Sequence, residues 1–183
     1  MIVVMMESGR KLFKYLYIYI AEIDAITASR YPPSSLSHSP LPLDGKRMGI
    51  LGIGVDVVHI PRIQAVLRRW GPDKFASRIL SQREMREWQF ELARSEAHDT
   101  IQNARFLAVR WALKEAAYKA LYPIVKPTWK ELTYQGKSKT GLKPLLQYHP
   151  LVDRQPIPTV TLHCSVSHDG DYVLASVLAE ERE

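Results

Sequence analysis

The segment from Asn103 to Leu121 constrains the fold most strongly, because its composition is that of one long helix. It contains no glycine, it is rich in alanine, and Pro123 follows its end. A helix in a globular protein is stabilised mainly by the surface against which it packs. At about 100° per residue, one face of this helix collects the apolar side chains of Phe106, Val109, Leu113, Ala117 and Ala120. We expect this face to lie against the core.

The rest of the chain reads as short helices and strands. Runs of β-branched or alternating residues predict strands at residues 50–58, 129–134, 159–166 and 172–178. Apolar residues three or four apart predict helices at residues 60–70, 74–80 and 81–92, the last with capping-box spacing between Ser81 and Glu84. This order of elements is typical of an α+β fold.

Composition narrows the class of protein. Of the 183 residues, 46% are hydrophobic and 24% are charged, as in an ordinary globular domain. The single cysteine excludes a disulfide scaffold and a cysteine-rich zinc site. No segment reaches the ~20 apolar residues of a membrane-spanning helix, so we expect no membrane association. The net charge of +6 suits an acidic protein or a phosphate-rich small molecule, and aromatic residues are too weakly interleaved with basic ones to favour nucleic acid.

Residues 1–47 differ in amino-acid composition from residues 48–183. The stretch from Thr27 to Leu43 is rich in serine and proline and predicts a flexible linker. We therefore expect one domain at residues 48–183, preceded by an extension. The extension matches a mitochondrial targeting sequence only in part, because acidic residues accompany its basic ones. A targeting segment and a poorly ordered or untranslated extension both remain open.

Asp56 is the first candidate site residue. It follows Gly52-Ile-Gly-Val55 and precedes two valines, so it lies inside a strongly apolar strand. A carboxylate there needs a partner or a cation to offset its desolvation. Mg²⁺ binds through one or two carboxylates together with substrate phosphates, which suits this position. The alternative is that Asp56 ends the strand and caps the next helix.

Glu115 on the long helix is the second candidate. It lies opposite the apolar face, where three alanines leave space beside it: Ala104, Ala108 and Ala112. An exposed salt bridge with Lys119, four residues later, is the simpler alternative. In the C-terminal hairpin, His163 and His168 face opposite sides of a strand, which argues against a shared metal. Ser167 and His168 at the end of that strand could donate hydrogen bonds to a phosphate.

Five blocks of the chain form a larger pattern. They are Gly52-Ile-Gly-Val-Asp-Val-Val-His-Ile-Pro-Arg-Ile63, Phe75-Ala-Ser-Arg-Ile-Leu80 with Glu84, Phe106-Leu-Ala-Val-Arg-Trp-Ala-Leu-Lys-Glu-Ala-Ala-Tyr-Lys-Ala-Leu121, Gly141-Leu-Lys-Pro144 and His163-Cys-Ser-Val-Ser-His168. In this order they resemble the motifs of the holo-[acyl-carrier-protein] synthases, the short type of 4′-phosphopantetheinyl transferase. The resemblance covers residues 50–178 and implies a long central helix packed on a small, mostly antiparallel sheet.

The resemblance also implies a reaction. The family transfers the phosphopantetheine arm of coenzyme A to a serine of an acyl carrier protein and releases adenosine 3′,5′-bisphosphate, in support of fatty acid synthesis. Asp56 and Glu115 would be the Mg²⁺ ligands, and Lys119 would stabilise charge on the leaving phosphate. The base that activates the serine would be Glu115 or a metal-held water. The residues expected to contact coenzyme A are Arg110, Lys114, Lys119, Ser167 and His168.

Basic residues before the long helix form either a solvated surface or a docking face for an acidic protein. They are Arg62, Arg68, Arg69, Lys74, Arg78, Arg83 and Arg86. The resemblance favours docking of the carrier protein, with contacts expected from Arg62, Arg69, Phe75 and Arg78. A protein of this fold that had lost catalysis could still dock there, so a non-enzymatic docking module is the alternative function.

Assembly and location are expected from the same resemblance. Compact members of the family are homotrimers, and a small domain has little concavity with which to enclose coenzyme A, a metal and a carrier serine. We therefore expect a homotrimer in which the strand of Asp56 from one subunit meets the hairpin of His168 from the next. Tyr122-Pro123 stands where the family pattern has a glycine, which could reshape the adenine pocket. The expected location is mitochondrial or cytoplasmic.

Overall fold

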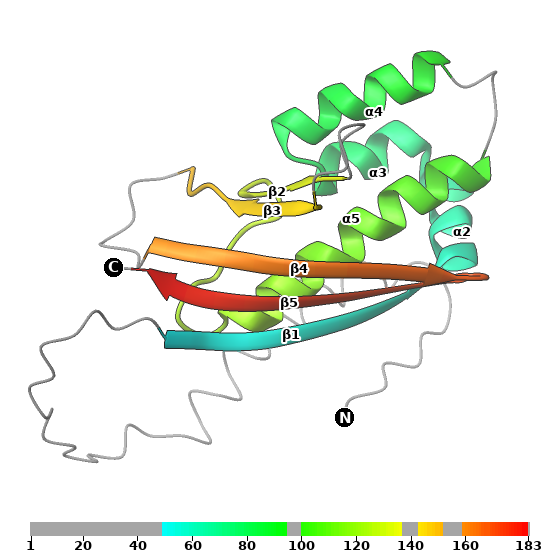
Figure 1. Ribbon diagram of the computed structural model, residues 1–183. Helices are drawn as coiled ribbons and strands as arrows, with labels where there is room; N and C mark the ends of the chain where they lie inside the picture. The colour runs from blue at the N-terminus through cyan, green and yellow to red at the C-terminus, as the bar shows by residue number, and fades with distance from the viewer. Residues whose placement is uncertain (1–48, 95–99, 137–142, 152–158, 183) are drawn as a thin grey trace, which may run out of the picture. The chain divides into compact units, whose positions relative to one another are not determined.

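The computed structural model describes residues 49–94, 100–136, 143–151 and 159–182. These residues form one five-stranded antiparallel sheet with helices against one of its faces (Figure 1). The strands are β1 (Gly49–His59), β2 (Leu132–Gln135), β3 (Leu145–Tyr148), β4 (Thr159–Asp169) and β5 (Tyr172–Arg182), in the spatial order β1-β5-β4-β3-β2. The helices are α2 (Ile60–Trp70), α3 (Pro72–Ile79), α4 (Gln82–Arg94) and α5 (Thr100–Leu121). The predicted α+β fold, with a long helix on a mostly antiparallel sheet, is confirmed.

Strands β1, β5 and β4 form the long part of the sheet. β4 and β5 make a hairpin that turns at Gly170, whose positive φ of 50° suits glycine. β1 pairs with β5 along its whole length, from Gly49 to His59. Alternate side chains of β5 point toward the helices and are at most 1% exposed: Val173, Ala175, Val177 and Ala179. This face of the sheet is therefore the floor of the core.

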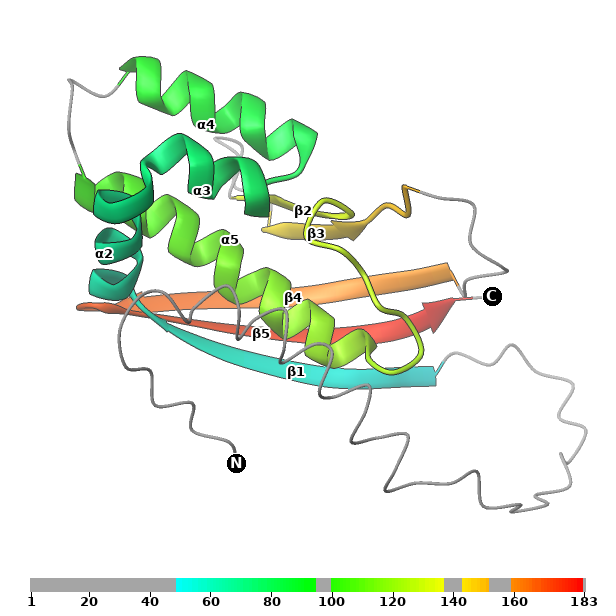
Figure 2. The same cartoon turned by 180° about the vertical axis from the view of Figure 1, so that it is seen from behind.

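Helix α5 lies across that floor (Figure 2) and is buried around most of its circumference, which corrects the predicted single apolar face. Phe106 and Val109 were expected in the core, but both are partly exposed. The side that was expected to be open is instead fully buried along Ala104, Ala108 and Ala112. Alanine side chains are small enough to let the helix approach the sheet closely, and a pattern of bulky apolar residues does not reveal such a face.

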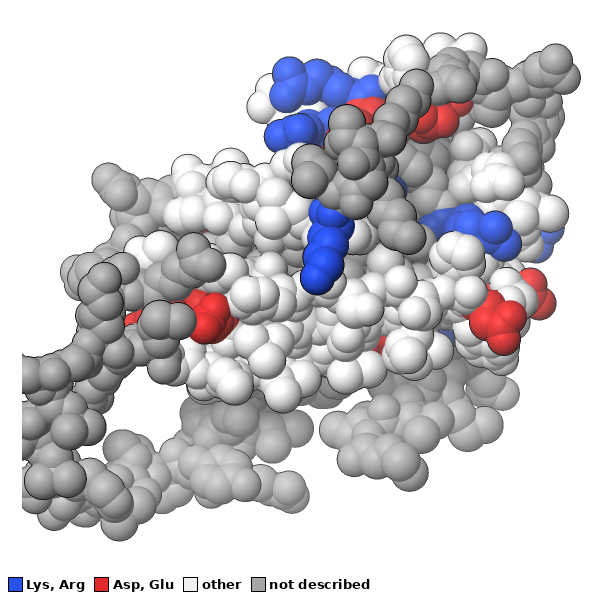
Figure 3. All heavy atoms as spheres, in the orientation of Figure 1, with Lys and Arg blue, Asp and Glu red and all other residues white. Residues whose placement is uncertain are grey.

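The opposite face of β1, β5 and β4 carries no helix in the described part of the chain (Figures 1 and 2). We call it the outer sheet face and define it by Ile53, Val55 and Val57 of β1 and Leu174 of β5, all at least 46% exposed. Figure 3, in the orientation of Figure 1, shows that the surface over these strands is almost free of charged side chains. A broad apolar surface of this kind is typical of an interaction site.

Some element boundaries differ from the prediction. β3 was not predicted, because Leu145–Tyr148 is a short pattern next to Pro144, and its pairing with β2 and β4 is what makes it a strand. β4 continues through Asp169, into the predicted turn. Within the described ranges, no helix is long and apolar enough to cross a membrane. The predicted extension at residues 1–47 lies outside the described residues.

Candidate active site

Asp56 lies under α5 because the residues that precede it on the same face of β1 are glycines. A side-chain carbon at Gly52 would overlap the carbonyl oxygen of Ala120, and one at Gly54 would overlap that of Ala116. The backbones of helix and strand are therefore in contact. Asp56 is the next residue on this face, so its carboxylate enters the space beside the helix. It does not cap α2, whose N-terminal cap residue is His59 and has no side-chain capping hydrogen bond.

Lys119 links Asp56 to α5. Its Nζ atom donates hydrogen bonds to Asp56 Oδ1 and to the carbonyl oxygen of Val55, both at 2.9 Å. Lys119 thus forms its salt bridge with Asp56. The simpler alternative, an exposed salt bridge between Lys119 and Glu115, is not what the described structure shows. An ammonium group has three N–H donors. The two acceptors among the described residues leave the third donor of this half-exposed side chain available to a ligand.

The two carboxylates interact electrostatically. Burial raises the pKa of Asp56, although the charges of Lys119 and Arg62 oppose the shift. Burial and, to a smaller extent, the negative charge of Asp56 raise the pKa of Glu115 to about 7, against the opposing effect of the Lys119 charge. The structure thus brings Asp56, Glu115 and Lys119 together, and this group carries a net negative charge when both carboxylates are ionised.

An excess of carboxylate charge of this kind fits a divalent cation. Two carboxylates on facing elements are ligands that a hard cation such as Mg²⁺ accepts, with substrate phosphates and water completing its shell. Across the ranges that the structure describes, no cluster of three or more His, Cys, Asp or Glu side chains could hold a metal alone. Asp56 and Glu115 therefore suit a metal that binds together with a phosphate substrate.

Lys114 has a different environment from Lys119, which corrects the prediction that it contacts coenzyme A. It is 1% exposed. Its Nζ atom donates to Glu84 Oε2 at 2.6 Å, to the carbonyl of Ile79 at 2.7 Å and to that of Trp129 at 2.8 Å. All three donors are satisfied inside the protein, so none remains for a phosphate.

Glu84 is the centre of this buried network. It is fully buried and also accepts hydrogen bonds from the backbone N–H groups of Ser81, at 2.8 Å, and Tyr134, at 3.0 Å. The N–H of Glu84 in turn donates to Ser81 Oγ at 3.3 Å, which confirms the predicted capping box. One carboxylate thus joins the start of α4 to α5 and β2.

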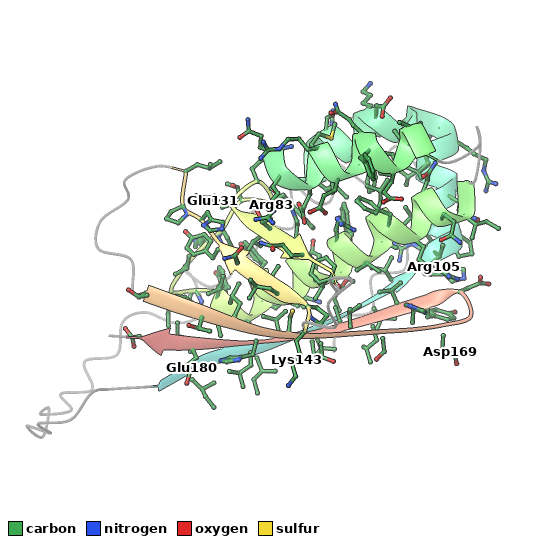
Figure 4. All side chains as sticks on the ribbon, turned by 45° about the horizontal axis from the view of Figure 1, so that its top comes forward. Arg83, Arg105, Glu131, Lys143, Asp169 and Glu180 are labelled. Atoms are coloured by element: carbon green, nitrogen blue, oxygen red, sulfur yellow. The ribbon has the colours of Figure 1, made fainter. Side chains whose placement is uncertain are left out.

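A cavity of about 630 Å³ lies on another side of α5. Its size is that of a small-molecule site. It is lined by residues of α4, α5, β2 and β4, namely Arg83, Glu87, Phe90, Glu91, Gln102, Asn103, Arg105, Phe106, Val109, Arg110, Tyr134, Gln135, Gly136 and His168. Figure 4 shows Arg83 at the start of α4 and Arg105 on α5 toward the β4–β5 hairpin, so the two lie well apart. Asp56, Glu115 and Lys119 do not line this cavity.

Arg110 is the most buried cation of the cavity, at 6% exposed. Its Nη2 atom donates to Glu87 Oε2 at 2.9 Å, and its Nη1 atom donates to the carbonyl of Phe106 at 3.3 Å. Its Nε atom lies 3.9 Å from Glu84 Oε1 and has no hydrogen-bond partner in the described structure. Arg110 is therefore fixed at the cavity wall with part of its donor capacity unused.

Ser167 and His168 are not brought together. His168 lines the cavity, whereas the preceding residue of a strand points to the opposite face. Ser167 lies opposite Leu174 in the β4–β5 register, and both belong to the exposed side of the sheet. Ser167 thus points away from the cavity of its own chain, and its contact with coenzyme A stays a prediction.

The predicted docking residues also divide into two groups. Arg62, Arg69 and Arg78 are exposed on α2 and α3, as docking requires. Phe75 is 0% exposed and stacks on Trp111, so it cannot contact a partner, and the prediction for this residue is wrong. Arg62 is close enough to Asp56 to lower the pKa of that carboxyl. The basic face of α2 therefore adjoins Asp56.

Sequence analysis did not find Glu87 and Arg105 among the cavity residues. Glu87 is one charged residue in a mostly polar helix, and nothing in its spacing singles it out. Arg105 precedes Arg110 by five residues, which places the two about 140° apart around the helix. Only the packing of α4 and β4 around α5 brings them to one cavity.

Comparison with known proteins assigns the family. Residues 52–175 match the 4′-phosphopantetheinyl transferase superfamily. The chain belongs to this family. It is 36% identical over 135 residues to a holo-[acyl-carrier-protein] synthase of Edwardsiella ictaluri, covering 73% of this chain and 99% of the relative. It is also 36% identical over 144 residues to "4′-phosphopantetheinyl transferase B, mitochondrial" of Aspergillus fumigatus. That match covers 70% of this chain and 93% of the relative.

The fold agrees with this assignment. A crystal structure of a holo-(acyl-carrier-protein) synthase of Bacillus anthracis in complex with CoA (3′,5′-ADP) superposes with a TM-score of 0.53 at 26% identity. The match covers 73% of this chain and 98% of that protein. The resemblance drawn from the five sequence blocks is thereby confirmed, and this phosphopantetheinyl transferase carries its acidic pair on β1 and α5.

Proposed function

We propose that the protein transfers 4′-phosphopantetheine from coenzyme A to a serine of an apo-acyl carrier protein in a Mg²⁺-dependent reaction, in support of fatty acid synthesis. The serine oxygen forms a bond to the phosphorus that bears pantetheine. The diphosphate P–O bond breaks, adenosine 3′,5′-bisphosphate leaves, and the serine proton passes to a base. The observation that carries the proposal is the joint placement of Asp56, Glu115 and Lys119 beside a basic docking face.

Each residue of this group has a role that follows from its contacts. Asp56 and Glu115 would hold Mg²⁺, which supplies positive charge to the diphosphate when it is bound. Asp56 also orients the Lys119 ammonium at 2.9 Å. The remaining N–H donor of Lys119 would stabilise the charge that develops on the leaving phosphate.

The cavity beside Arg110 and His168 would bind coenzyme A. Its volume and its mixture of arginine and aromatic residues suit a nucleotide with several phosphates. Lys114 is left out of the coenzyme site because its donors are used inside the protein. Ser167 lies on the other face of the sheet, so it would contact coenzyme A only at a site shared with a second subunit.

The carrier protein would dock on the exposed arginines of α2 and α3. Arg62, Arg69 and Arg78 present positive charge to an acidic partner, and Arg62 lies near Asp56. A serine held on this face would reach the carboxylates. Arg69→Glu should raise KM for the carrier protein and leave KM for coenzyme A unchanged, and an equal rise in both would contradict this docking face.

A homotrimer with shared sites would unite the two parts of the site. Within one chain the cavity contains His168 and Arg110 but none of Asp56, Glu115 and Lys119. The outer sheet face offers an apolar surface that a second copy of the chain could cover. The carboxylates of one subunit would then meet the cavity of the next, and closed cyclic symmetry would make all three sites equivalent.

Residues 48–183 would be the catalytic domain, since the family match lies within them. The location would be mitochondrial or cytoplasmic. The word mitochondrial in the name of the Aspergillus fumigatus relative supports the mitochondrial location. Imaging of the tagged full chain against organelle markers would decide between them.

The transfer itself can be tested with one assay. The full chain is incubated with coenzyme A, Mg²⁺ and an apo-acyl carrier protein, and the carrier is then weighed by mass spectrometry. We expect a mass increase of one phosphopantetheine group, which chelation of Mg²⁺ and the Asp56→Asn substitution both abolish. A carrier that binds but gains no mass would instead support the non-enzymatic docking module.

A further inference from the structure

Lys119 is the cation that Asp56 holds in the described structure. Its Nζ atom lies 2.9 Å from Asp56 Oδ1 and 2.9 Å from the carbonyl oxygen of Val55. The Asp56 side chain is only 18% exposed, whereas that of Lys119 is 42% exposed. The carboxylate is thus enclosed, and the lysine reaches it from the more open side. A metal ion that binds Asp56 must therefore approach the charge of Lys119 closely.

The charges of the group do not favour a metal ion by itself. Asp56 and Glu115 carry two negative charges when both are ionised, and Lys119 balances one of them. A divalent ion added to these three residues would leave an excess of positive charge in a partly buried place, which is costly. The diphosphate of coenzyme A would restore the balance with its own negative charge. The group is therefore complementary to a metal ion and a diphosphate together.

The ligands that the group offers lead to the same conclusion. Mg²⁺ takes oxygen ligands in octahedral geometry and usually completes its shell with water and substrate phosphates. In the parts of the chain that the structure describes, no set of three or more His, Cys, Asp or Glu side chains could hold a metal ion. Asp56 and Glu115 thus supply part of a shell, and one oxygen of Asp56 is engaged by Lys119. Phosphate oxygens would supply what the chain lacks.

We propose that Lys119 is a resident counter-ion that opposes metal binding to Asp56 and Glu115 until coenzyme A binds, so that metal and coenzyme bind cooperatively. This rests on the proposed function, in which coenzyme A is the donor. When the diphosphate arrives, the Lys119 ammonium would exchange Asp56 Oδ1 for a phosphate oxygen. The exposure of this side chain and its flexible stem allow such a turn, and its hydrogen bond to the carbonyl of Val55 anchors it.

Calorimetric titration of the full chain with magnesium chloride tests the proposal without catalysis. One titration is made without coenzyme A and one with saturating coenzyme A but no carrier protein, so that no transfer occurs. Heat from Mg²⁺ binding to coenzyme A alone is subtracted. The wild type should bind Mg²⁺ about 10-fold more tightly, or better, when coenzyme A is present. Equal affinities in the two titrations would overturn the proposal.

Lys119→Met separates a counter-ion from a simple metal bridge between protein and coenzyme. The substitution removes the charge and keeps a side chain of similar length. We expect the variant to bind Mg²⁺ alone about 10-fold more tightly than the wild type, because the repulsion between the ammonium and a divalent ion is lost. The gain on adding coenzyme A should shrink. Lys119→Arg, which keeps the charge, should bind Mg²⁺ alone as weakly as the wild type.

Two matched variants separate this contact from general electrostatics. Arg62→Gln removes a charge that lowers the pKa of Asp56 less than Lys119 does, and Lys126→Met removes an exposed lysine beyond α5. Lys126→Met should bind Mg²⁺ alone like the wild type, and Arg62→Gln should change that affinity less than Lys119→Met does. The proposal fails if Lys119→Met binds Mg²⁺ alone no more tightly than the wild type, or if Arg62→Gln has an equal effect.

The wild type provides a further measurement that does not depend on the folding of a variant. Coupling between two ligands is reciprocal, so Mg²⁺ should raise the affinity for coenzyme A by the same factor by which coenzyme A raises that for Mg²⁺. An affinity for coenzyme A that Mg²⁺ leaves unchanged would contradict the cooperativity. If the wild type transfers nothing to the carrier protein, the proposed function fails. The titrations with Mg²⁺ alone would still decide whether Lys119 opposes the metal.

Discussion

Gly54 of β1 lies against the carbonyl oxygen of Ala116 on α5, with no room for a side-chain carbon between them. This backbone contact brings the Glu115 carboxylate of the helix close enough to the Asp56 carboxylate of the strand for their charges to interact. Neither Asp56 nor Glu115 could reach the other if an ordinary side chain separated the two elements. The acidic pair therefore depends on two glycines that carry no chemistry themselves.

Gly54→Ala should push α5 away from β1. We expect an overpacking cost of about 1–3 kcal/mol in the free energy of unfolding and a large loss of transfer activity. Urea unfolding and the carrier mass assay measure the two effects. Gly49→Ala is the matched control, because a side-chain carbon there meets nothing within 4 Å. A fully active and stable Gly54→Ala protein would show that the close contact is unnecessary.

Lys119→Ala should lower kcat by about 100-fold or more, because it removes one donor to the leaving phosphate. KM for the carrier protein should change little. Lys126→Ala, which removes an exposed lysine just beyond α5, serves as the control. Rapid-quench measurement of single turnovers would report the chemical step directly. A change confined to KM would assign Lys119 to binding instead.

Lys114→Met should act on stability and not on coenzyme binding. The substitution leaves the Glu84 carboxylate buried without its closest cation, at a cost of about 3–5 kcal/mol in unfolding free energy. Denaturant unfolding should show this loss. Calorimetry on the fraction that remains folded should give an unchanged affinity for adenosine 3′,5′-bisphosphate. A stable variant with weakened nucleotide binding would restore Lys114 to the coenzyme site.

Ile53→Glu should prevent self-association through the outer sheet face. Ile53 is 66% exposed and lies opposite Leu178 in the sheet, so a charge here would have to be buried in any interface formed there. Sedimentation velocity should show a trimer for the wild type and smaller species for the variant. Gln89→Glu on the exposed side of α4 should leave the assembly intact. A wild type that is monomeric and fully active would exclude the shared site.

A chain that begins at Met48 should be as active as the full chain. The match to the family lies within residues 52–175. Side-by-side mass assays at equal protein concentration, with circular dichroism to confirm folding, make the comparison. An inactive or insoluble shorter chain would show that the preceding residues belong to the domain.

The sequence predicts well those features that depend on residues close together in the chain. The Ser81–Glu84 capping box, the strand that bears Asp56 and the helix that bears Glu115 all follow from local spacing. Their order along the chain was enough to indicate an α+β fold. β3 was missed because four residues become a strand only through the neighbours that pair with them.

The environment of a charged side chain is much harder to predict. Lys114 and Lys119 lie in the same block of sequence, yet one is enclosed by three acceptors and the other keeps a donor for a ligand. The difference arises from Glu84 and Trp129, which packing brings to Lys114 from other elements. Phe75 was misassigned for the same reason, since only the tertiary fold shows that Trp111 covers it.

The buried Glu84 carboxylate has a consequence for how the domain comes apart. Its partners lie three residues away at Ser81, thirty away at Lys114 and fifty away at Tyr134. A half-assembled chain in which β2 or α5 has detached would keep a charge inside with too few partners, which makes that state costly. Partly unfolded states that lack either β2 or α5 are therefore high in free energy. We expect α4, α5 and β2 to lose hydrogen-exchange protection together, as one cooperative unit.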